Sequence, residues 1–219
     1  MPSLHPNSPS LNPNYKPSFE NSIFDFDITN ASQKAVKMNN EMQSNNSENH
    51  IQFFTATILY WQQLLKENRY KQIIIDSLRF LTDEKRITVY AFVIMPNHIH
   101  LLWKINEGHK RETVQRDFLR FTAQKIKQDL QNTNSSDLSK FCVNLSDRQY
   151  QFWERNALSI DIYSREVLEQ KLDYIHNNPL QQKWLSETDD QPCFYSSASF
   201  YQQDDNCHWT FLTHYMNAC

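Results

Sequence analysis

The sequence predicts an α+β fold, a ferredoxin-like βαββαβ antiparallel sheet with an additional C-terminal helix that carries Tyr174. Two observations predict this fold class. Runs rich in β-branched and aromatic residues alternate with stretches whose apolar residues recur every three or four positions, and the two patterns follow one another in the order that the fold requires. Because a ferredoxin-like sheet supports many activities, the fold class alone indicates no function.

The length and composition of the chain indicate one folded domain with flanking segments. Its 219 residues are 39% hydrophobic, which is enough for one sizeable core. Residues 1–50 are rich in Asn, Ser and Pro and have no sustained apolar period, which is typical of a disordered polar leader. We therefore expect the folded domain to span residues 51–183, and residues 184–219 to form a tail packed on the domain or flanking it.

The first strand and the first helix directly follow the leader. The run "QFFTATILYW", which begins at Gln52, alternates and is rich in β-branched and aromatic residues, as a strand should be. The run "YKQIIIDSLRFL", residues 70–81, has Ile74, Leu78 and Leu81 at the spacing of one helix face. These two runs therefore predict the opening βα unit of the fold.

The next two strands are predicted to form a hairpin. The runs "RITVYAFVIM" and "HIHLLWKI", residues 86–95 and 98–105, are both apolar and strand-like. They are separated by Pro96 and Asn97, two residues that favour tight turns. An antiparallel pair of strands is the expected result.

A helix, a strand and a closing helix complete the prediction. Residues 111–130 carry a helical apolar stripe, the polar segment 131–140 is expected to be a loop, and "RQYQFWER", residues 148–155, is expected to be the fourth strand. The closing helix is "SREVLEQKLDYIHNN", with Ser164 as its N-cap and Pro179 at its end.

Charge and cysteine content narrow the possible function classes. The whole chain has a net charge of −3, yet residues 51–183 hold 19 Lys and Arg against 15 Asp and Glu, a balance that is compatible with phosphate binding. The widely spaced Cys142, Cys193, Cys207 and Cys219 form no CxxC pair and indicate neither a zinc knuckle nor a disulfide framework. No membrane-spanning run or export signal is evident, so we expect a soluble cytoplasmic protein without a membrane partner.

The run "VIMPNHIHLLW" places His98 and His100 one residue apart in an otherwise apolar strand. Side chains alternate along a strand, so both imidazoles should point one way and Ile99 the other. At about 7 Å apart along the strand they can converge on one ion, and neutral imidazole is a common ligand of divalent metals. The alternative is a pair of polar side chains on the exposed face of a half-buried sheet or at the hairpin mouth.

The run "KLDYIHNNP" offers a second set of polar side chains. Tyr174 and Asn178 are four residues apart on one face of the predicted helix, with Lys171 on the same side. A phenol with its ordinary pKa near 10 attacks at neutral pH only beside a base or a cation, such as a metal ion or Lys171. His176 faces elsewhere and is a secondary candidate, and for Tyr174 the alternative is an aromatic packed at a rim.

Taken together, these segments resemble the single-tyrosine HUH transposases, and within them the REP-associated tyrosine transposases of bacteria. The matching segments cover about residues 51–201 and are "FFTATILYW", "YKQIIIDSLRF", "VIMPNHIHLLW", "QFWERN", "LDYIHNNPLQQKW" and "FYSSASFY". Their order and rough spacing also agree with the family. The combination is far more specific than two spaced histidines.

The resemblance implies a metal-dependent transposase that uses Mg²⁺ or Mn²⁺ and acts on single-stranded DNA, often in hairpin-bearing ends. By position, His98 and His100 match the metal-binding pair, Tyr174 matches the nucleophile, and Asn178 matches the polar residue that completes the metal site. The implied reaction forms a 5′-phosphotyrosine link and a free 3′-OH, and a later 3′-OH attack rejoins strands without ATP. We expect the protein to act as a monomer or a homodimer.

Basic side chains outside the metal site are expected to contact the DNA backbone. These residues are Lys104, Arg116, Arg120, Lys127 and Lys171. Phosphate contacts by Lys and Arg dominate the affinity of proteins for DNA. The alternative is that the basic stripe is merely a solvated helix face.

Aromatic and glycine content complete the functional interpretation. Trp103, Phe152 and Trp153 are candidates to stack on unpaired bases, with core packing as the alternative. The chain has one glycine, Gly108, which excludes a glycine-rich phosphate loop, so we expect no nucleotide cofactor. Two other functions stay open: a metal-dependent phosphoesterase in which water attacks, and a non-catalytic or domesticated nucleic-acid-binding protein.

Overall fold

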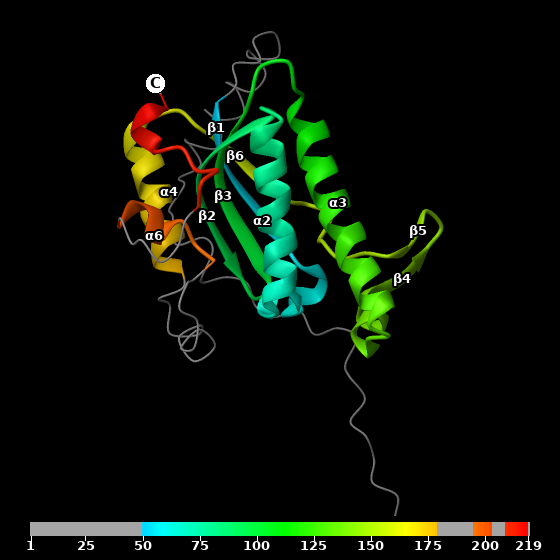
Figure 1. Ribbon diagram of the computed structural model, residues 1–219. Helices are drawn as coiled ribbons and strands as arrows, with labels where there is room; N and C mark the ends of the chain where they lie inside the picture. The colour runs from blue at the N-terminus through cyan, green and yellow to red at the C-terminus, as the bar shows by residue number, and fades with distance from the viewer. Residues whose placement is uncertain (1–49, 179–194, 203–208, 219) are drawn as a thin grey trace, which may run out of the picture. The chain divides into compact units, whose positions relative to one another are not determined.

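A four-stranded antiparallel sheet forms the centre of the computed structural model, which describes residues 50–178, 195–202 and 209–218 (Figure 1). The described residues lie in one compact unit, residues 49–219. The strands are β1 (Ile51–Thr57), β2 (Ile87–Met95), β3 (His98–Ile105) and β6 (Leu158–Ile162), in the order β2-β3-β1-β6. All three neighbouring pairs are antiparallel.

Two helices connect the strands in the ferredoxin-like manner. Helix α2 (Asn68–Asp83) follows β1, and helix α3 (Arg111–Asn132) follows β3. Each crossover skips one strand of the sheet, which is the split βαβ arrangement of this fold. The predicted fold class is therefore confirmed.

Helices cover both faces of the sheet, and each face has its own hydrophobic core. Helices α2 and α3 pack on the face that carries Phe54, Ile99 and Trp103. Helix α4 (Arg165–Asn177) packs on the opposite face through its predicted apolar stripe, Leu168, Leu172 and Ile175 (Figure 1). The sheet thus separates α4 from the other two long helices.

Helix α4 begins where the sequence predicts. The Oγ of Ser164 accepts a hydrogen bond from the backbone N–H of Val167 at 3.3 Å, which satisfies one of the free donors of the first turn. Asn178, the C-cap, keeps helical dihedral angles of φ −57° and ψ −45°. Pro179, the predicted helix terminator, lies outside the described residues.

The prediction of residues 148–155 as the fourth strand is wrong. Only Arg148–Tyr150 is a strand, β5, and it pairs with β4 (Cys142–Leu145) in a separate two-stranded sheet. The apolar Trp153 does not belong to a strand but fills the core beside α3. There its Nε1 donates to Oγ1 of Thr122 at 3.0 Å. The actual fourth strand, β6, is an edge strand with exposed apolar side chains.

Two C-terminal segments, residues 195–202 and 209–218, pack along the free edge of β2. The backbone N–H of Ser197 donates to the carbonyl oxygen of Phe92 at 2.9 Å, and that of Thr213 donates to the carbonyl oxygen of Val89 at 2.9 Å.

The predicted leader, apart from His50, and residues 179–194 lie outside the described residues. Part of the segment that was expected to be a loop forms a 3-10 helix, residues 136–141. No helix within the described ranges is long and apolar enough to cross a membrane.

Candidate active site

His98 and His100 begin strand β3 and project together from the face that α4 covers. Their ring centroids are 4.7 Å apart, and the side chains are 7% and 6% exposed. Ile99 between them is fully buried in the core on the opposite face, as the alternation of a strand requires. Because both imidazoles are buried, they are not polar residues on an exposed sheet face.

Hydrogen bonds at the Nδ1 atoms orient both rings. Asn97 Oδ1 lies 2.6 Å from Nδ1 of His98, and because an amide oxygen only accepts, this nitrogen carries the proton. Thr55 Oγ1 lies 2.7 Å from Nδ1 of His100. A partner at Nδ1 determines which ring nitrogen of a histidine can bind a metal, and for His100 that nitrogen is Nε2.

His100 is held in its neutral form. Burial is the main cause that lowers its pKa well below the ordinary value, and the positive charge of Lys171 acts in the same direction, as would a second proton on His98. Neutral imidazole is the form that binds a metal ion. His100 is therefore ready to act as a ligand at neutral pH without first losing a proton.

Helix α4 places Tyr174 against the histidine pair. Its ring centroid is 5.3 Å from that of His100 and 5.8 Å from that of Phe53. This position follows from the apolar stripe of α4, which faces the sheet and leaves Tyr174 half-buried beside it. Burial raises the pKa of Tyr174, and a side-chain hydrogen bond with Asn178 partly offsets that rise.

Lys171 lies one turn before Tyr174. Its Nζ is 4.9 Å from the ring centroid of Phe53 and 5.9 Å from that of Tyr174. Burial lowers the pKa of Lys171. An ammonium group at this position favours ionisation of the neighbouring phenol through its charge.

The donor set fits a divalent metal ion. Asn178 is 2% exposed, and its Oδ1 has no hydrogen-bond partner among the described residues. Nε2 of His100 is likewise buried and without a partner in the described part of the chain. A buried acceptor without a partner is costly, and a cation bound by both atoms would remove that cost. Imidazole nitrogen and amide oxygen are suitable ligands for Mn²⁺ and related ions.

Two known proteins that this chain resembles, one in sequence and one in structure, are REP-associated tyrosine transposases. The chain is 24% identical over 140 residues to the REP-associated tyrosine transposase of Escherichia coli (strain K12), a match that covers 64% of this chain and 72% of that protein. The resemblance to REP-associated tyrosine transposases is confirmed. The fold is also similar to that of a REP-associated tyrosine transposase bound to a REP hairpin, with a TM-score of 0.50 and 17% identity over 75% of this chain and 86% of that chain. No family model matches the sequence.

The other basic residues predicted to contact DNA lie away from the site around His98, His100 and Tyr174. Lys104 pairs with Ile51 near the far end of β3, about 20 Å from His98 by the rise of a strand. Arg116, Arg120 and Lys127 are on α3, across the sheet from α4. Among the predicted DNA-contacting residues, only Lys171 adjoins Tyr174.

The three aromatic side chains considered for base stacking all belong to the core. Trp103, Phe152 and Trp153 are 0%, 3% and 6% exposed. Sequence reasoning missed Trp61, an aromatic residue that does lie near His98, and its neighbour Tyr60. The Trp61 ring centroid is 6.3 Å from that of His98, and Tyr60 is 63% exposed.

Tyr60 and Trp61 share an uncommon backbone conformation. Their φ angles are 55° and 56°, in the left-handed region that residues with side chains seldom adopt. The N–H of Tyr60 donates to Glu154 Oε1 at 2.9 Å, and that of Trp61 donates to the carbonyl of Ile58 at 2.9 Å. The signal in the sequence is the aromatic pair that ends "QFFTATILYW", a run whose composition predicts a strand throughout.

Proposed function

We propose that this protein is a transposase that cleaves and rejoins single-stranded DNA through a 5′-phosphotyrosine intermediate, in which Tyr174 is the nucleophile. The supporting observation is the packing of Tyr174 beside His100, together with the hydrogen bond that Tyr174 accepts from the amide group of Asn178. The named relatives are tyrosine transposases, and one of them was solved with a DNA hairpin. We extend both features to this chain, with hairpin-containing single-stranded DNA as the substrate and the protein acting as a monomer or a homodimer.

His98, His100 and Asn178 are the residues that would hold a divalent ion, Mg²⁺ or Mn²⁺. When bound, the ion supplies a Lewis acid for a non-bridging oxygen of the scissile phosphate. Asn97 and Thr55 fix the orientation of the two imidazoles, and the buried setting keeps His100 neutral. Residues of the protein therefore orient these ligands before any ion binds.

Tyr174 carries the covalent step. Its phenolic oxygen forms a bond to phosphorus while the bond between phosphorus and the 3′ oxygen breaks, and the phenolic proton is transferred in net terms to the departing 3′ oxygen. Lys171 lies beside the phenol ring, where a positive charge would favour the phenolate. Asn178 holds the phenol by a hydrogen bond. Attack by another 3′-OH on the phosphotyrosine reverses the step and rejoins DNA, since one phosphodiester replaces another.

The decisive experiment is the capture of the covalent intermediate. End-labelled single-stranded DNA with a hairpin is incubated with the full chain and Mn²⁺ or Mg²⁺, and denaturing gel electrophoresis separates protein-linked label from free label. We expect a protein–DNA adduct that Tyr174→Phe abolishes and that Tyr163→Phe, an exposed tyrosine just before α4, leaves unchanged. An undiminished adduct with Tyr174→Phe would show that the nucleophile is misassigned.

The same assay separates the two other functions. A phosphoesterase that uses water would give shortened strands without an adduct at any time. A non-catalytic binding protein would give neither product, and its DNA affinity would be indifferent to EDTA and to His98→Ala. For the proposed enzyme, His98→Ala or His100→Ala abolishes cleavage while sparing most of the DNA affinity, because phosphate contacts by other residues dominate binding.

A further inference from the structure

His176 lies on α4 between Tyr174 and Asn178 but on the other flank of the helix. Successive residues of an α-helix are about 100° apart around its axis. Ile175 faces the sheet, so Tyr174 projects from one side of the buried stripe and His176 from the other. Asn178, which keeps helical dihedral angles, returns to the side of Tyr174. Any rotation of the last turn of α4 therefore moves Tyr174 and His176 together.

A buried serine outside the helix holds the ring of His176. Nε2 of His176 lies 2.9 Å from Oγ of Ser197, and Ser197 is fully buried. Burial lowers the pKa of His176 to about 4, so the ring carries no charge at neutral pH. His176 thus contributes a hydrogen bond rather than a charge to the end of α4.

Ser197 is fixed to the free edge of β2 by three hydrogen bonds. Its backbone N–H donates to the carbonyl oxygen of Phe92 at 2.9 Å, and its Oγ donates to the same oxygen at 3.2 Å. The backbone N–H of Phe92 donates to Ser197 Oγ at 3.0 Å. The preceding residue, Ser196, is paired with Val93 of β2. The partner of His176 is therefore fastened to the sheet itself.

One row of residues across the sheet joins the two contacts of α4. Ser196 pairs with Val93 of β2, and Val93 pairs with His100 of β3. Neighbouring strands are about 4.8 Å apart, so the contact at Ser197 lies about 10 Å across the sheet from the contact at His100. This distance matches the diameter of an α-helix with its side chains, about 10–12 Å. Helix α4 thus lies over β2 with one polar contact on each side.

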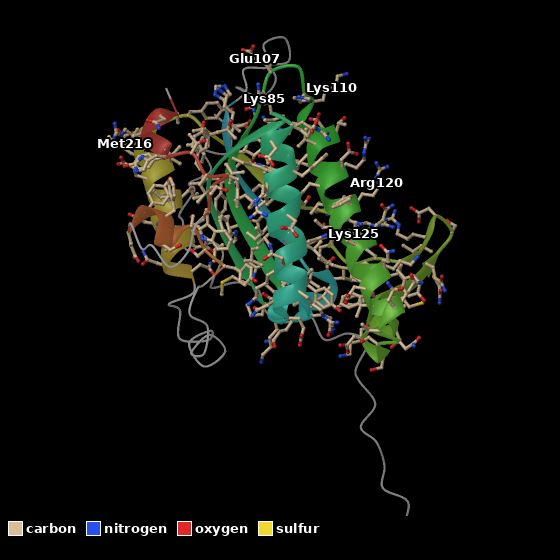
Figure 2. The ribbon with its side chains drawn as sticks, in the orientation of Figure 1. Lys85, Glu107, Lys110, Arg120, Lys125 and Met216 are labelled. Carbon is tan, nitrogen blue, oxygen red and sulfur yellow. The ribbon has the colours of Figure 1, made fainter. Side chains whose placement is uncertain are left out.

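The second C-terminal segment contacts α4 farther from the site. The hydroxyl of Tyr215 donates to Oε1 of Glu169 at 3.1 Å, and Met216, the next residue, is 57% exposed (Figure 2). Glu169 precedes Tyr174 by five residues, about 7.5 Å along the helix axis. This outer contact joins the same helix to the C-terminal region, so it provides a matched comparison for the contact of His176.

We propose that the hydrogen bond between His176 and Ser197 positions Tyr174 for the covalent step, an inference that rests on the proposed transposase function. The bond prevents the last turn of α4 from rotating on the sheet, and so keeps the phenol beside His100 and Asn178 on the same side. A misplacement of about 1 Å at a reacting atom can slow a reaction about 100-fold. His176 and Ser197 are therefore positioning residues that act through Tyr174.

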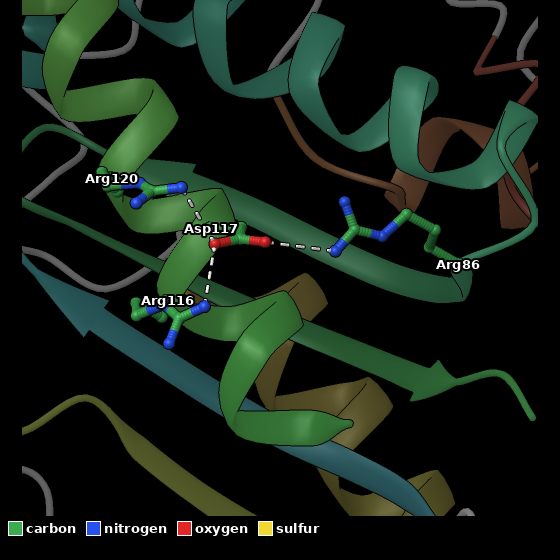
Figure 3. Close-up of polar contacts among 4 residues, drawn as sticks. All are labelled: Arg86, Arg116, Asp117 and Arg120. Atoms are coloured by element: carbon green, nitrogen blue, oxygen red, sulfur yellow. Dashed lines mark hydrogen bonds and ion pairs between the residues drawn. The ribbon is translucent and has the colours of Figure 1, made fainter. Parts of the chain in front are cut away.

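The test compares substitutions at His176 with two controls. His176→Leu removes the bond, whereas His176→Gln supplies an amide that can bond to Ser197. Tyr215→Phe removes the outer contact of α4, and Arg86→Gln removes the 3.4 Å ion pair with Asp117 on the other face of the sheet (Figure 3). Each full-length variant is mixed with Mn²⁺ and saturating, labelled hairpin DNA, and the single-turnover rate of adduct formation is measured. DNA affinity in EDTA and unfolding in urea are measured in parallel.

We expect His176→Leu to slow adduct formation about 10- to 100-fold while DNA affinity stays within about twofold of the parent, because the substitution misplaces Tyr174 without removing a phosphate contact. His176→Gln should restore most of the rate. Both controls should keep the parent rate even where they lower the free energy of unfolding. Ser197→Ala should slow the step as His176→Leu does, and the double variant should be no slower than either single variant, since one shared bond is lost.

Three results would overturn the proposal: an unchanged rate in His176→Leu, an equal loss in Tyr215→Phe, or additive effects of His176→Leu and Ser197→Ala. The same holds if His176→Gln is as slow as His176→Leu, because the bond would then not be what matters. If His176→Leu fails to fold, Ser197→Ala, which deletes a single oxygen atom, provides the test.

A measurement without DNA separates this inference from the proposed function. The NMR signals of ¹³C-labelled tyrosine rings report the position of Tyr174 against His100, whose ring centroid is 5.3 Å away, and Tyr174→Phe identifies the signal. His176→Leu should move this signal, and Tyr215→Phe should not. A moved signal without any adduct in the parent chain would refute the enzyme and leave the positioning role in place. An adduct in the parent with an unmoved signal and an unchanged rate in His176→Leu would refute only the positioning role.

Discussion

Thr55 and His100 lie directly opposite each other on strands β1 and β3, with Oγ1 of the threonine 2.7 Å from Nδ1 of the imidazole. Thr55→Val keeps the shape of the side chain and removes this partner. We expect the affinity for Mn²⁺ to fall about 10- to 100-fold, because such partners orient metal-binding histidines. Metal titration followed by thermal shift or calorimetry measures the effect. Thr57→Val, one position along the same face of β1, is the control, and an equal loss there would contradict a specific role for Thr55.

Lys171 is predicted to assist the ionisation of Tyr174. Its Nζ is 5.9 Å from the phenol ring centroid, so Lys171→Gln removes a positive charge beside the phenolate. We expect adduct formation at neutral pH to slow about tenfold, which corresponds to a rise of about one unit in the pKa of the phenol. The pH dependence of the adduct rate should shift upward, and Lys171→Arg should restore most of the rate. An unshifted pH profile would instead indicate that Lys171 only packs against Phe53.

Tyr201 should make the protein sensitive to alkaline pH. Burial raises its pKa to about 12, whereas the unfolded chain has the ordinary value near 10. Between these values the unfolded state loses a proton that the folded state keeps, so stability is fully present below pH 10 and declines as the pH rises toward 12. Urea unfolding at several pH values should show this decline in the parent and a smaller one in Tyr201→Phe. Identical pH dependences would mean that Tyr201 ionises freely in the folded chain.

The buried hydrogen bond between Trp153 and Thr122 should stabilise the fold. Trp153 Nε1 donates to Thr122 Oγ1 at 3.0 Å, and Thr122→Val leaves this buried donor without a partner. The expected loss in the free energy of unfolding is about 1–3 kcal/mol. The control is Thr82→Val on α2, whose hydroxyl also donates to a carbonyl one turn earlier but accepts no such bond. Chemical denaturation of both variants should show a clearly larger loss at position 122.

The features that could be predicted from the sequence are those with a local period. Alternation along a strand puts His98 and His100 on one face and Ile99 on the other, and the structure shows this arrangement. The helical spacing of Leu168, Leu172 and Ile175 likewise defines the face of α4 that meets the sheet, and with it the direction of Tyr174. Neither inference needed knowledge of a distant part of the chain.

The features that could not be predicted depend on tertiary contacts. Phe152 and Trp153 fill a core beside α3. Composition alone cannot distinguish apolar residues that fill a core in a loop from apolar residues of a strand. In β6, apolar and polar residues alternate, but Leu158 and Ile160 are each 41% exposed, the reverse of the arrangement expected for a half-buried strand. The hydrogen bond between Thr55 and His100 could not be predicted, because it depends on the register between β1 and β3, which the sequence does not reveal.

The orientation of Asn178 is a third case. A residue before proline is biased away from helical dihedral angles, and this bias opposes the helical position that would place the Asn178 side chain near Tyr174. The structure shows helical angles at Asn178 and a side chain that is 2% exposed. The packing of α4 on the sheet therefore overrides the local preference at this position.

The two C-terminal segments leave the sheet with unequal borders. Backbone groups of Val89 and Phe92 on β2 are already bonded to Thr213 and Ser197, so another chain could add a strand at this border only by displacing them. Strand β6 forms the opposite border, and its neighbour in the sheet is β1. Strand addition to the described sheet would therefore favour β6, and with a single open border in each chain it would end at a pair of chains.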